Sequence, residues 1–150
     1  MNRYYIIKDT IFDLLEKNHG LEHSSNVANM ACLLAKLEGL DLELAAVIGI
    51  CHDIAKYKFN SSFDHANRSS MITREILINS KLFSNEEIIL ITTAIKNHSF
   101  KERIDTQYSE LIKNADLLVQ YLNEPRALFS KEKQTRLDNL FKTLEKKDSC

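Results

Sequence analysis

Apolar residues recur every three or four positions along almost the whole chain, and this spacing is typical of amphipathic α-helices. The pattern predicts helices over approximately residues 3–18, 22–38, 41–55, 64–79, 84–98, 106–123 and 126–147. The segments 56–63 and 99–105 lack it, so we expect irregular loops there. With three glycines and one proline, the chain has almost none of the turn residues that β-hairpins need. We therefore expect an all-α, bundle-like domain of about six or seven helices.

Several residues mark where these helices begin and end. Gly20 is expected to end the first helix as its left-handed cap, and Asp41 is expected to begin the third as its N-cap. Ser84 followed by Glu87 has the sequence of a capping box, which predicts the start of the fifth helix. The chain therefore carries its own boundary signals for most of the predicted helices.

Length, composition and charge limit the classes of protein that remain. A chain of 150 residues with 44% hydrophobic residues suits one domain with one core, which we take as residues 1–150. The formal net charge is −1, from 20 Lys and Arg against 21 Asp and Glu. This balance argues against a nucleic acid or an anionic membrane as the main partner.

The lack of targeting signals and the small, odd number of cysteines predict a cytoplasmic protein. The charged N-terminal stretch lacks the apolar centre of a signal peptide, and the longest apolar run, Leu44 to Cys51, is too short to span a bilayer. The three cysteines, Cys32, Cys51 and Cys150, are odd in number and fit no zinc motif. We expect a soluble cytoplasmic protein without a disulfide framework.

Candidate chemistry comes from polar residues at inward-facing positions of the predicted helices. His23 is followed by Val27 and Ala31 on one apolar stripe, so it lies at one end of a buried face. His65 and His98 lie in the same way on two other helices. The inward-facing set is His23, His52, Asp53, His65, His98 and Asp116. The fifth histidine, His19, is interpreted as a structural residue at a helix end.

Each member of this set has an ordinary explanation when it is taken alone. A histidine on an apolar face is commonly a core residue bonded to a carbonyl group, and an inward Asp is commonly a cap or half of an ion pair. Burying six such groups without a common partner is costly, whereas a divalent cation would compensate all of them. We therefore favour a shared metal site. Its nitrogen and oxygen donors suit Fe, Mn, Co, Ni or Zn and argue against Ca.

The order of these residues resembles a known family. The series His23, then His52-Asp53, then Asp116 is similar to the H…HD…D signature of the HD-domain superfamily of metal-dependent phosphohydrolases. The segments LEHSSNVANMACLLAKLEGL, LAAVIGICHDIAKY and KNADLLVQYL also resemble that family. The resemblance covers about residues 20–125. It implies a single HD domain, with the helix at about 126–147 lying beyond the motif core.

His65 and His98 extend the resemblance to a subset with six ligands. In that subset, two further histidines between the HD pair and the last Asp supply ligands for a second metal ion. The resemblance implies two ions with Asp53 bridging them, and the division of the histidines between the ions stays open. It also implies a phosphohydrolase that acts on a nucleotide or another small phosphorylated substrate.

Basic residues near the motifs are candidates for binding that substrate. Lys56 follows His52 by one helical turn, and in similar proteins a Lys here is associated with substrate phosphate, so Asp53 and Lys56 are the expected catalytic residues. Arg68 follows His65 by one turn and could bind a phosphate through two hydrogen bonds. The ordinary alternative is surface charge, and for Lys56 also the favourable electrostatics of a helix C-terminus.

Lys101 and Arg103, in the loop after His98, are further candidates of the same kind, again with surface charge as the alternative. Cys51 is interpreted as a buried, inert thiol. The last helix carries seven Lys and Arg between Arg126 and Lys147 beside an apolar stripe, so we expect it to pack on the domain or on a second subunit of a homodimer.

Two other functions fit the same six ligands. One is a di-iron oxygenase on the same scaffold, since a few similar proteins have that activity. The other is a module that binds a nucleotide or a metal without catalysis. The complete ligand set favours the hydrolase.

Overall fold

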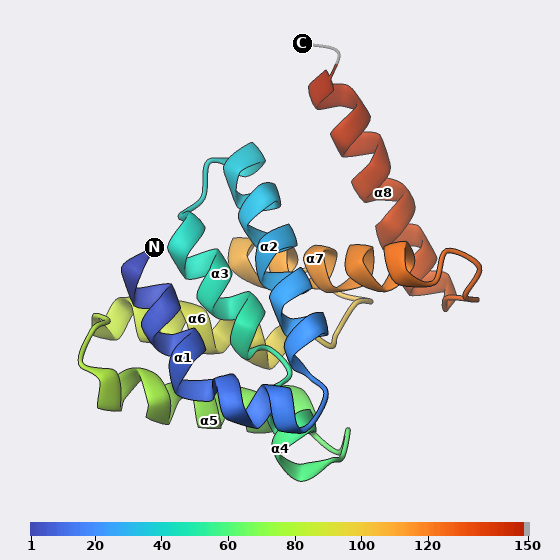
Figure 1. Ribbon diagram of the computed structural model, residues 1–150. Helices are drawn as coiled ribbons and strands as arrows, with labels where there is room; N and C mark the ends of the chain where they lie inside the picture. Colours follow the sequence, from blue (N-terminus) through green and yellow to red (C-terminus); the bar gives the residue numbers. More distant parts are fainter. Residues whose placement is uncertain (149–150) are drawn as a thin grey trace.

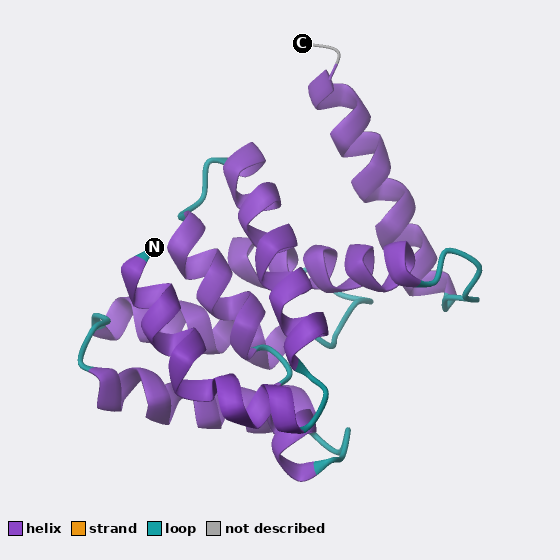
Figure 2. Ribbon diagram, viewed as in Figure 1, coloured by secondary structure: helices purple, strands orange, loops and turns teal. Residues whose placement is uncertain are grey.

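The computed structural model describes residues 1–148, with side chains up to residue 146, and this part of the chain is helical without any strand (Figures 1 and 2). In chain order the helices are α1 (Asn2–Lys17), α2 (Leu21–Glu38), α3 (Leu42–Cys51), α4 (Ile54–Phe59), α5 (His65–Ser80), α6 (Asn85–Asn97), α7 (Gln107–Asn123) and α8 (Lys131–Asp148). The all-α prediction is confirmed. The short helix α4 was not predicted as a separate helix.

Helix α3 lies at the centre of the bundle. All residues from Leu44 to Cys51 are buried, as expected for a helix that is apolar on every side. It packs against α1, α2, α6 and α7. Its contact with α2 is very close, because a Cβ added at Gly49 would lie 2.5 Å from the Cα of Ala28. The C-terminal residue of α3, Cys51, therefore lies in the interior of the bundle.

The third predicted helix, expected to reach about Ala55, ends at Cys51. His52 and Asp53 form a turn. Helix α4 begins at Ile54 and includes residues that were expected to form the end of the third helix and the start of a loop. Apolar periodicity did not reveal this break because the residues on both sides of it are apolar. His52 itself keeps helical backbone angles, with φ −56° and ψ −33°. The backbone N–H of Ala55 donates to the buried Ser69 hydroxyl at 3.0 Å, which ties α4 to α5.

Two of the predicted caps are confirmed and one is wrong. The Asp41 carboxylate accepts a hydrogen bond from the Leu44 backbone at 2.9 Å, and Ser84 with Glu87 forms the complete capping box. The left-handed residue after α1 is His19, with φ +61°, and not Gly20. Gly20 matters for another reason, because a Cβ there would lie 2.5 Å from the ring of Tyr57.

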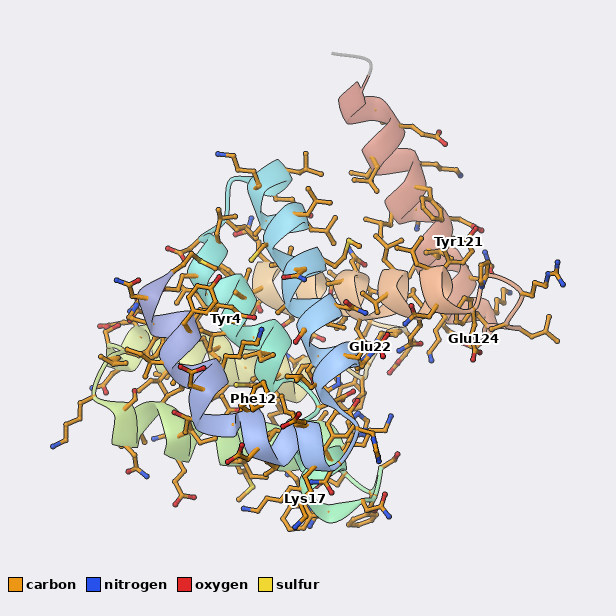
Figure 3. All side chains as sticks on the ribbon, viewed as in Figure 1. Tyr4, Phe12, Lys17, Glu22, Tyr121 and Glu124 are labelled. Atoms are coloured by element: carbon orange, nitrogen blue, oxygen red, sulfur yellow. The ribbon has the colours of Figure 1, made fainter. Side chains whose placement is uncertain are left out.

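Helix α8 begins at Lys131, later than the predicted residue 126. The Ser130 hydroxyl accepts from the Lys133 backbone at 3.3 Å, so Ser130 supplies the cap that the earlier positions lack. The apolar stripe of α8 packs on the domain: Leu137 is buried, and the ring of Phe141 contacts that of Tyr121 edge-on at 5.5 Å between centroids. Tyr121 lies where α7 and α8 meet (Figure 3). Beyond this junction α8 projects away from the bundle (Figure 1).

Core residues from α1 to α8 form one continuous cluster. Among the described residues, no helix is long and apolar enough to cross a membrane. The cysteines behave as expected where they are described: Cys32 and Cys51 are free, and burial raises the pKa of the Cys51 thiol to about 12. Cys150 lies outside the described residues.

Candidate metal centre

The six inward-facing residues come together at one place, around the end of α3. His23 lies in the first turn of α2, and His52 and Asp53 form the turn between α3 and α4. His65 is the first residue of α5, and His98 follows the last residue of α6. The sixth residue, Asp116, lies within α7. Helices α2, α5 and α7 therefore each contribute one residue, and the other three residues come from the turn between α3 and α4 and from the end of α6.

The cluster divides into two groups that share Asp53. The first group is His23, His52, Asp53 and Asp116, whose candidate ligand atoms all lie within 4.8 Å of one another. The Asp53 Oδ2 atom lies 3.5 Å from His23 Nε2 and 3.2 Å from His52 Nε2. The Asp116 Oδ1 atom lies 3.2 Å and 3.4 Å from the same two nitrogens.

The second group is Asp53, His65 and His98, with the same 4.8 Å limit between ligand atoms. Here the other oxygen of Asp53 is used: Oδ1 lies 3.4 Å from His65 Nε2 and 3.1 Å from His98 Nε2. One carboxylate thus faces both groups, with a different oxygen towards each. The sequence left the division of the histidines open, and the geometry pairs His65 with His98.

Three of the histidine rings are held by backbone carbonyl groups of the preceding turn. The Nδ1 atoms of His52 and His98 lie 2.7 Å from the carbonyl oxygens of Gly49 and Ile95. His65 Nδ1 lies 3.1 Å from the carbonyl oxygen of Ser62. Because a carbonyl can only accept, each Nδ1 carries a proton, and Nε2 is the ring nitrogen that faces the cluster. A second hydrogen bond of this kind is what orients a metal-binding histidine.

Two buried atoms in the first group have no hydrogen-bond partner among the described residues. They are His52 Nε2 and Asp116 Oδ1, which lie 3.4 Å apart. Buried polar atoms are normally satisfied, so a ring nitrogen and a carboxylate oxygen that both lack a partner at one place indicate a missing common partner. A cation would satisfy both atoms, and the donor set of imidazole and carboxylate fits a divalent transition metal.

The electrostatics of the cluster also favour a bound positive charge. Burial opposes a charged His52 ring, but the carboxylates of Asp53 and Asp116 outweigh burial and raise the pKa of His52 to about 10. Burial lowers the pKa of His98 despite its contact with Asp53. Burial acts to raise the pKa of both carboxyl groups, yet His52 holds that of Asp53, and Lys101 that of Asp116, well below the usual range. Both carboxylates are therefore ionised.

Two of the four histidine rings in the cluster are partly exposed. His52 and His98 are fully buried, whereas the side chains of His23 and His65 each keep 24% of their surface exposed. These two rings come from different groups, so both groups reach solvent.

Sequence reasoning missed the role of Lys101. It was considered a phosphate ligand or a surface charge, but it is buried, and its ammonium donates to Asp116 Oδ2 at 2.9 Å and to the His98 carbonyl oxygen at 2.7 Å. No periodicity exists in the loop that carries it, so the direction of its side chain could not be read from the sequence. Tyr57 was also missed; burial and the nearby Asp53 charge raise its pKa to about 12, which keeps it a neutral phenol beside the cluster.

The other basic candidates lie outside the cluster. Lys56 is exposed on α4, not on the last turn of α3 as predicted. The Arg68 guanidinium stacks on the ring of Phe59, 3.9 Å from its centroid. Arg103 binds Asp105 at 3.0 Å. Within the described chain, none of these three cations forms an ion pair with the six clustered residues. The last histidine, His19, is exposed and lies outside both groups.

Comparisons with known proteins give a consistent result. A family model described as HD domain matches residues 20–120. Ribonuclease Y from Thermus thermophilus is 32% identical over 98 residues, which are 65% of this chain but 16% of that protein, so the chain spans only a small part of that relative. The crystal structure of a predicted HD superfamily hydrolase from an uncultured Thermotogales bacterium has a TM-score of 0.60 and 17% identity, and covers 95% of this chain and 87% of that one.

Proposed function

Because the chain belongs to the HD-domain family, we propose that it is a metal-dependent phosphohydrolase acting on a nucleotide or another small phosphate ester. The observation that carries the proposal is the shared carboxylate of Asp53, with one oxygen towards each of two ligand groups. This arrangement supports a dinuclear site in a single HD domain. Two divalent ions bound there would supply Lewis-acid chemistry, because they would polarise a phosphoryl group and make water acidic enough to react at neutral pH.

The residues of the chain would hold and orient such ions. His23, His52 and Asp116 would hold one ion, and His65 and His98 the other, with Asp53 bridging them. The carbonyl groups that fix three of the rings would keep their Nε2 atoms directed inward. Asp53 would also accept a hydrogen bond from the attacking water and so orient it, which makes Asp53, together with Lys56, an expected catalytic residue.

The proposed substrate contacts are Lys56 and Arg68, which lie outside the cluster of six residues. The exposed Lys56 would neutralise phosphate charge, and Arg68, which already stacks on Phe59, would present its fork of N–H groups to phosphate oxygens. Both follow a cluster residue in sequence by about one helical turn. The 24% exposure of the His23 and His65 side chains supports entry of the reacting phosphate at these two rings.

The test is metal analysis combined with a hydrolysis screen. The wild-type protein, dialysed against Mn²⁺ and freed of excess, should contain close to two ions per chain by mass spectrometry. The panel should include a chromogenic phosphomonoester, nucleotides, a dinucleoside polyphosphate and, because the relative from Thermus thermophilus is named a ribonuclease, a short single-stranded RNA. Asp53→Ala should lose both bound metal and hydrolysis, because both groups depend on this carboxylate.

Asp9→Ala is the matched control, since Asp9 is exposed on α1 and lies outside both ligand groups. Hydrolysis that survives in Asp53→Ala would contradict the proposal. Turnover that requires Fe(II) and O₂ and stops with Mn²⁺ would instead favour the di-iron oxygenase, which the same donor set permits. Metal binding without any turnover over the panel would favour the non-catalytic module.

A further inference from the structure

Lys101 is a buried cation with two fixed partners, both of which belong to the candidate centre. Its side chain is 7% exposed, and its ammonium donates to Asp116 Oδ2 and to the backbone carbonyl of His98. A buried lysine is stable in the charged state only when it is paired and hydrogen-bonded, and here both conditions hold. Lys101 therefore connects the loop after α6 to two of the six ligand residues.

The contact with Asp116 leaves one carboxylate oxygen for the cluster. Oδ2 accepts from Lys101 at 2.9 Å and from the Gln120 amide at 3.2 Å, so it is fully engaged away from the histidines. Oδ1 has no hydrogen-bond partner among the described residues and faces His23 and His52. The ammonium thus restricts Asp116 to binding through a single oxygen and fixes the plane of the carboxylate.

The loop that carries Lys101 is held by α8. The Arg136 guanidinium donates from Nε to the Lys101 carbonyl oxygen and from Nη2 to the Arg103 carbonyl oxygen, both at 3.0 Å. Its Nη1 atom donates to Glu110 and Asn114 of α7 at 3.0 and 3.1 Å. The Arg136 side chain thus joins two carbonyl groups of the loop after α6 to two side chains of α7. A lysine could not reproduce this, because its single ammonium cannot span the same fork.

From this chain of contacts we infer that Lys101 and Arg136 are positioning residues of the metal centre, and that α8 is a functional part of it. Arg136 holds the loop, the loop places Lys101, and Lys101 orients Asp116 and the end of α6 at His98. Helix α8 lies outside residues 20–120, the range matched by the family model. The inference rests on the proposed function, because positioning has meaning only if these residues bind a metal.

The experiment measures metal binding rather than turnover. Mn²⁺ affinity is determined by calorimetry, and the visible spectrum of the Co²⁺ form reports ligand geometry, which loss of stability alone would not change. Lys101→Met removes the charge but keeps a long side chain, and should weaken Mn²⁺ binding by about 10–100-fold, the usual effect of losing a group that orients a ligand. Arg136→Lys should weaken it by less, under about tenfold, in the same direction. Both variants should alter the Co²⁺ spectrum.

Lys142→Met is the control, because Lys142 is exposed on the same helix, and it should behave as wild type. If Lys101→Met binds Mn²⁺ as wild type does with an unchanged spectrum, the inference is overturned and the proposed hydrolase stands. If Arg136→Lys binds Mn²⁺ with wild-type affinity, the proposed role of α8 is overturned. If Lys101→Met does not fold, the Mn²⁺ affinity of Arg136→Lys alone tests the inference. If wild-type protein binds no metal, both the inference and the proposed function fail.

Discussion

At the scale of single residues, Asp53 has the largest number of contacts within the cluster. Its Oδ2 faces His23 and His52, and its Oδ1 faces His65 and His98. The two groups differ in the number of carboxylates: the first contains Asp116 as well as Asp53, and the second contains Asp53 alone. The first group would therefore be the tighter site, and the second would depend on each of its two histidines.

His65→Ala should consequently reduce the bound metal from two ions per chain to one. His23, His52, Asp53 and Asp116 would remain for the first ion, whereas His98 and one oxygen of Asp53 are too few to hold the second. The measurement is metal content per chain after dialysis against Mn²⁺. His19→Asn serves as the control, since Asn tolerates the left-handed backbone of this exposed position. Two ions in His65→Ala would remove His65 from the set of ligands.

The sequence allowed these six residues to be selected because each one sits on an apolar stripe or at the end of an apolar helix, and such positions must converge on the core. The structure brings all six together. Lys101 could not be selected in this way, since its burial depends on the tertiary path of a loop and on Asp116, fifteen residues further along the chain. Gly20 was assigned the wrong role because its lack of a Cβ serves packing against Tyr57 and not a positive φ.

At the scale of helices, the ends of elements determine the site. His98 directly follows α6, so its position depends on where α6 stops, and the opposite end of that helix is fixed by the capping box of Ser84 and Glu87. Glu87 also accepts from Arg3 at 3.0 Å, which joins α6 to α1. The cap therefore stabilises the bundle at the end of α6 that is remote from the metal centre.

Ser84→Ala should lower the free energy of unfolding by about 1 kcal/mol, the usual value for loss of an N-cap hydroxyl, without changing metal content. Urea denaturation followed by circular dichroism gives the first quantity, and mass spectrometry gives the second. Thr143→Ala in the exposed part of α8 is the control, because a hydroxyl within a helix has no capping role, and no loss is expected. A loss of metal in Ser84→Ala would show that the two ends of α6 are coupled.

The sequence predicted that the longer helices exist, but it did not predict the break between α3 and α4 or the residue at which α8 begins. Periodicity reported the amphipathic faces of the longer helices other than α3, since each of them buries one stripe, whereas α3 was visible as a continuous apolar run. The turn at His52 and Asp53 interrupts a segment whose residues are apolar on both sides, so hydrophobicity carried no signal of it. The start of α8 depended on Ser130, a single cap five residues after the only proline.

At the scale of the whole molecule, Arg3 joins three helices through two carboxylates. Its Nε donates to Glu43 of α3 at 2.6 Å and its Nη1 to Glu87 of α6 at 3.0 Å. Burial acts to raise the pKa of Glu43, but the hydrogen bonds from Arg3, from the N-terminal ammonium and from the Tyr4 backbone together outweigh it, and the pKa is lowered to about 2. A carboxyl group with a lowered pKa stabilises the folded state above its ordinary pKa and loses this effect as the pH falls towards the folded value.

The difference in unfolding free energy between wild type and Glu43→Gln should therefore be full above pH 4.5, the ordinary pKa, and should shrink as the pH falls from 4.5 towards 2. Urea denaturation over this range, with a chelator present so that metal release does not contribute, provides the measurement. Glu16→Gln, an exposed substitution on α1, should show no such dependence. A difference that stays constant down to pH 2 would contradict the assignment of Glu43.

The close approach of α2 and α3 has an evolutionary consequence. His23 begins one of these helices and His52 follows the other, so the distance between their rings depends on how near the two backbones lie. That distance is set where Gly49 meets Ala28, with no room for a further carbon atom. A residue that touches no ligand would then be under the same selective constraint as the ligands themselves. Among related chains, we expect positions 28 and 49 to remain small, or to change size only as a pair.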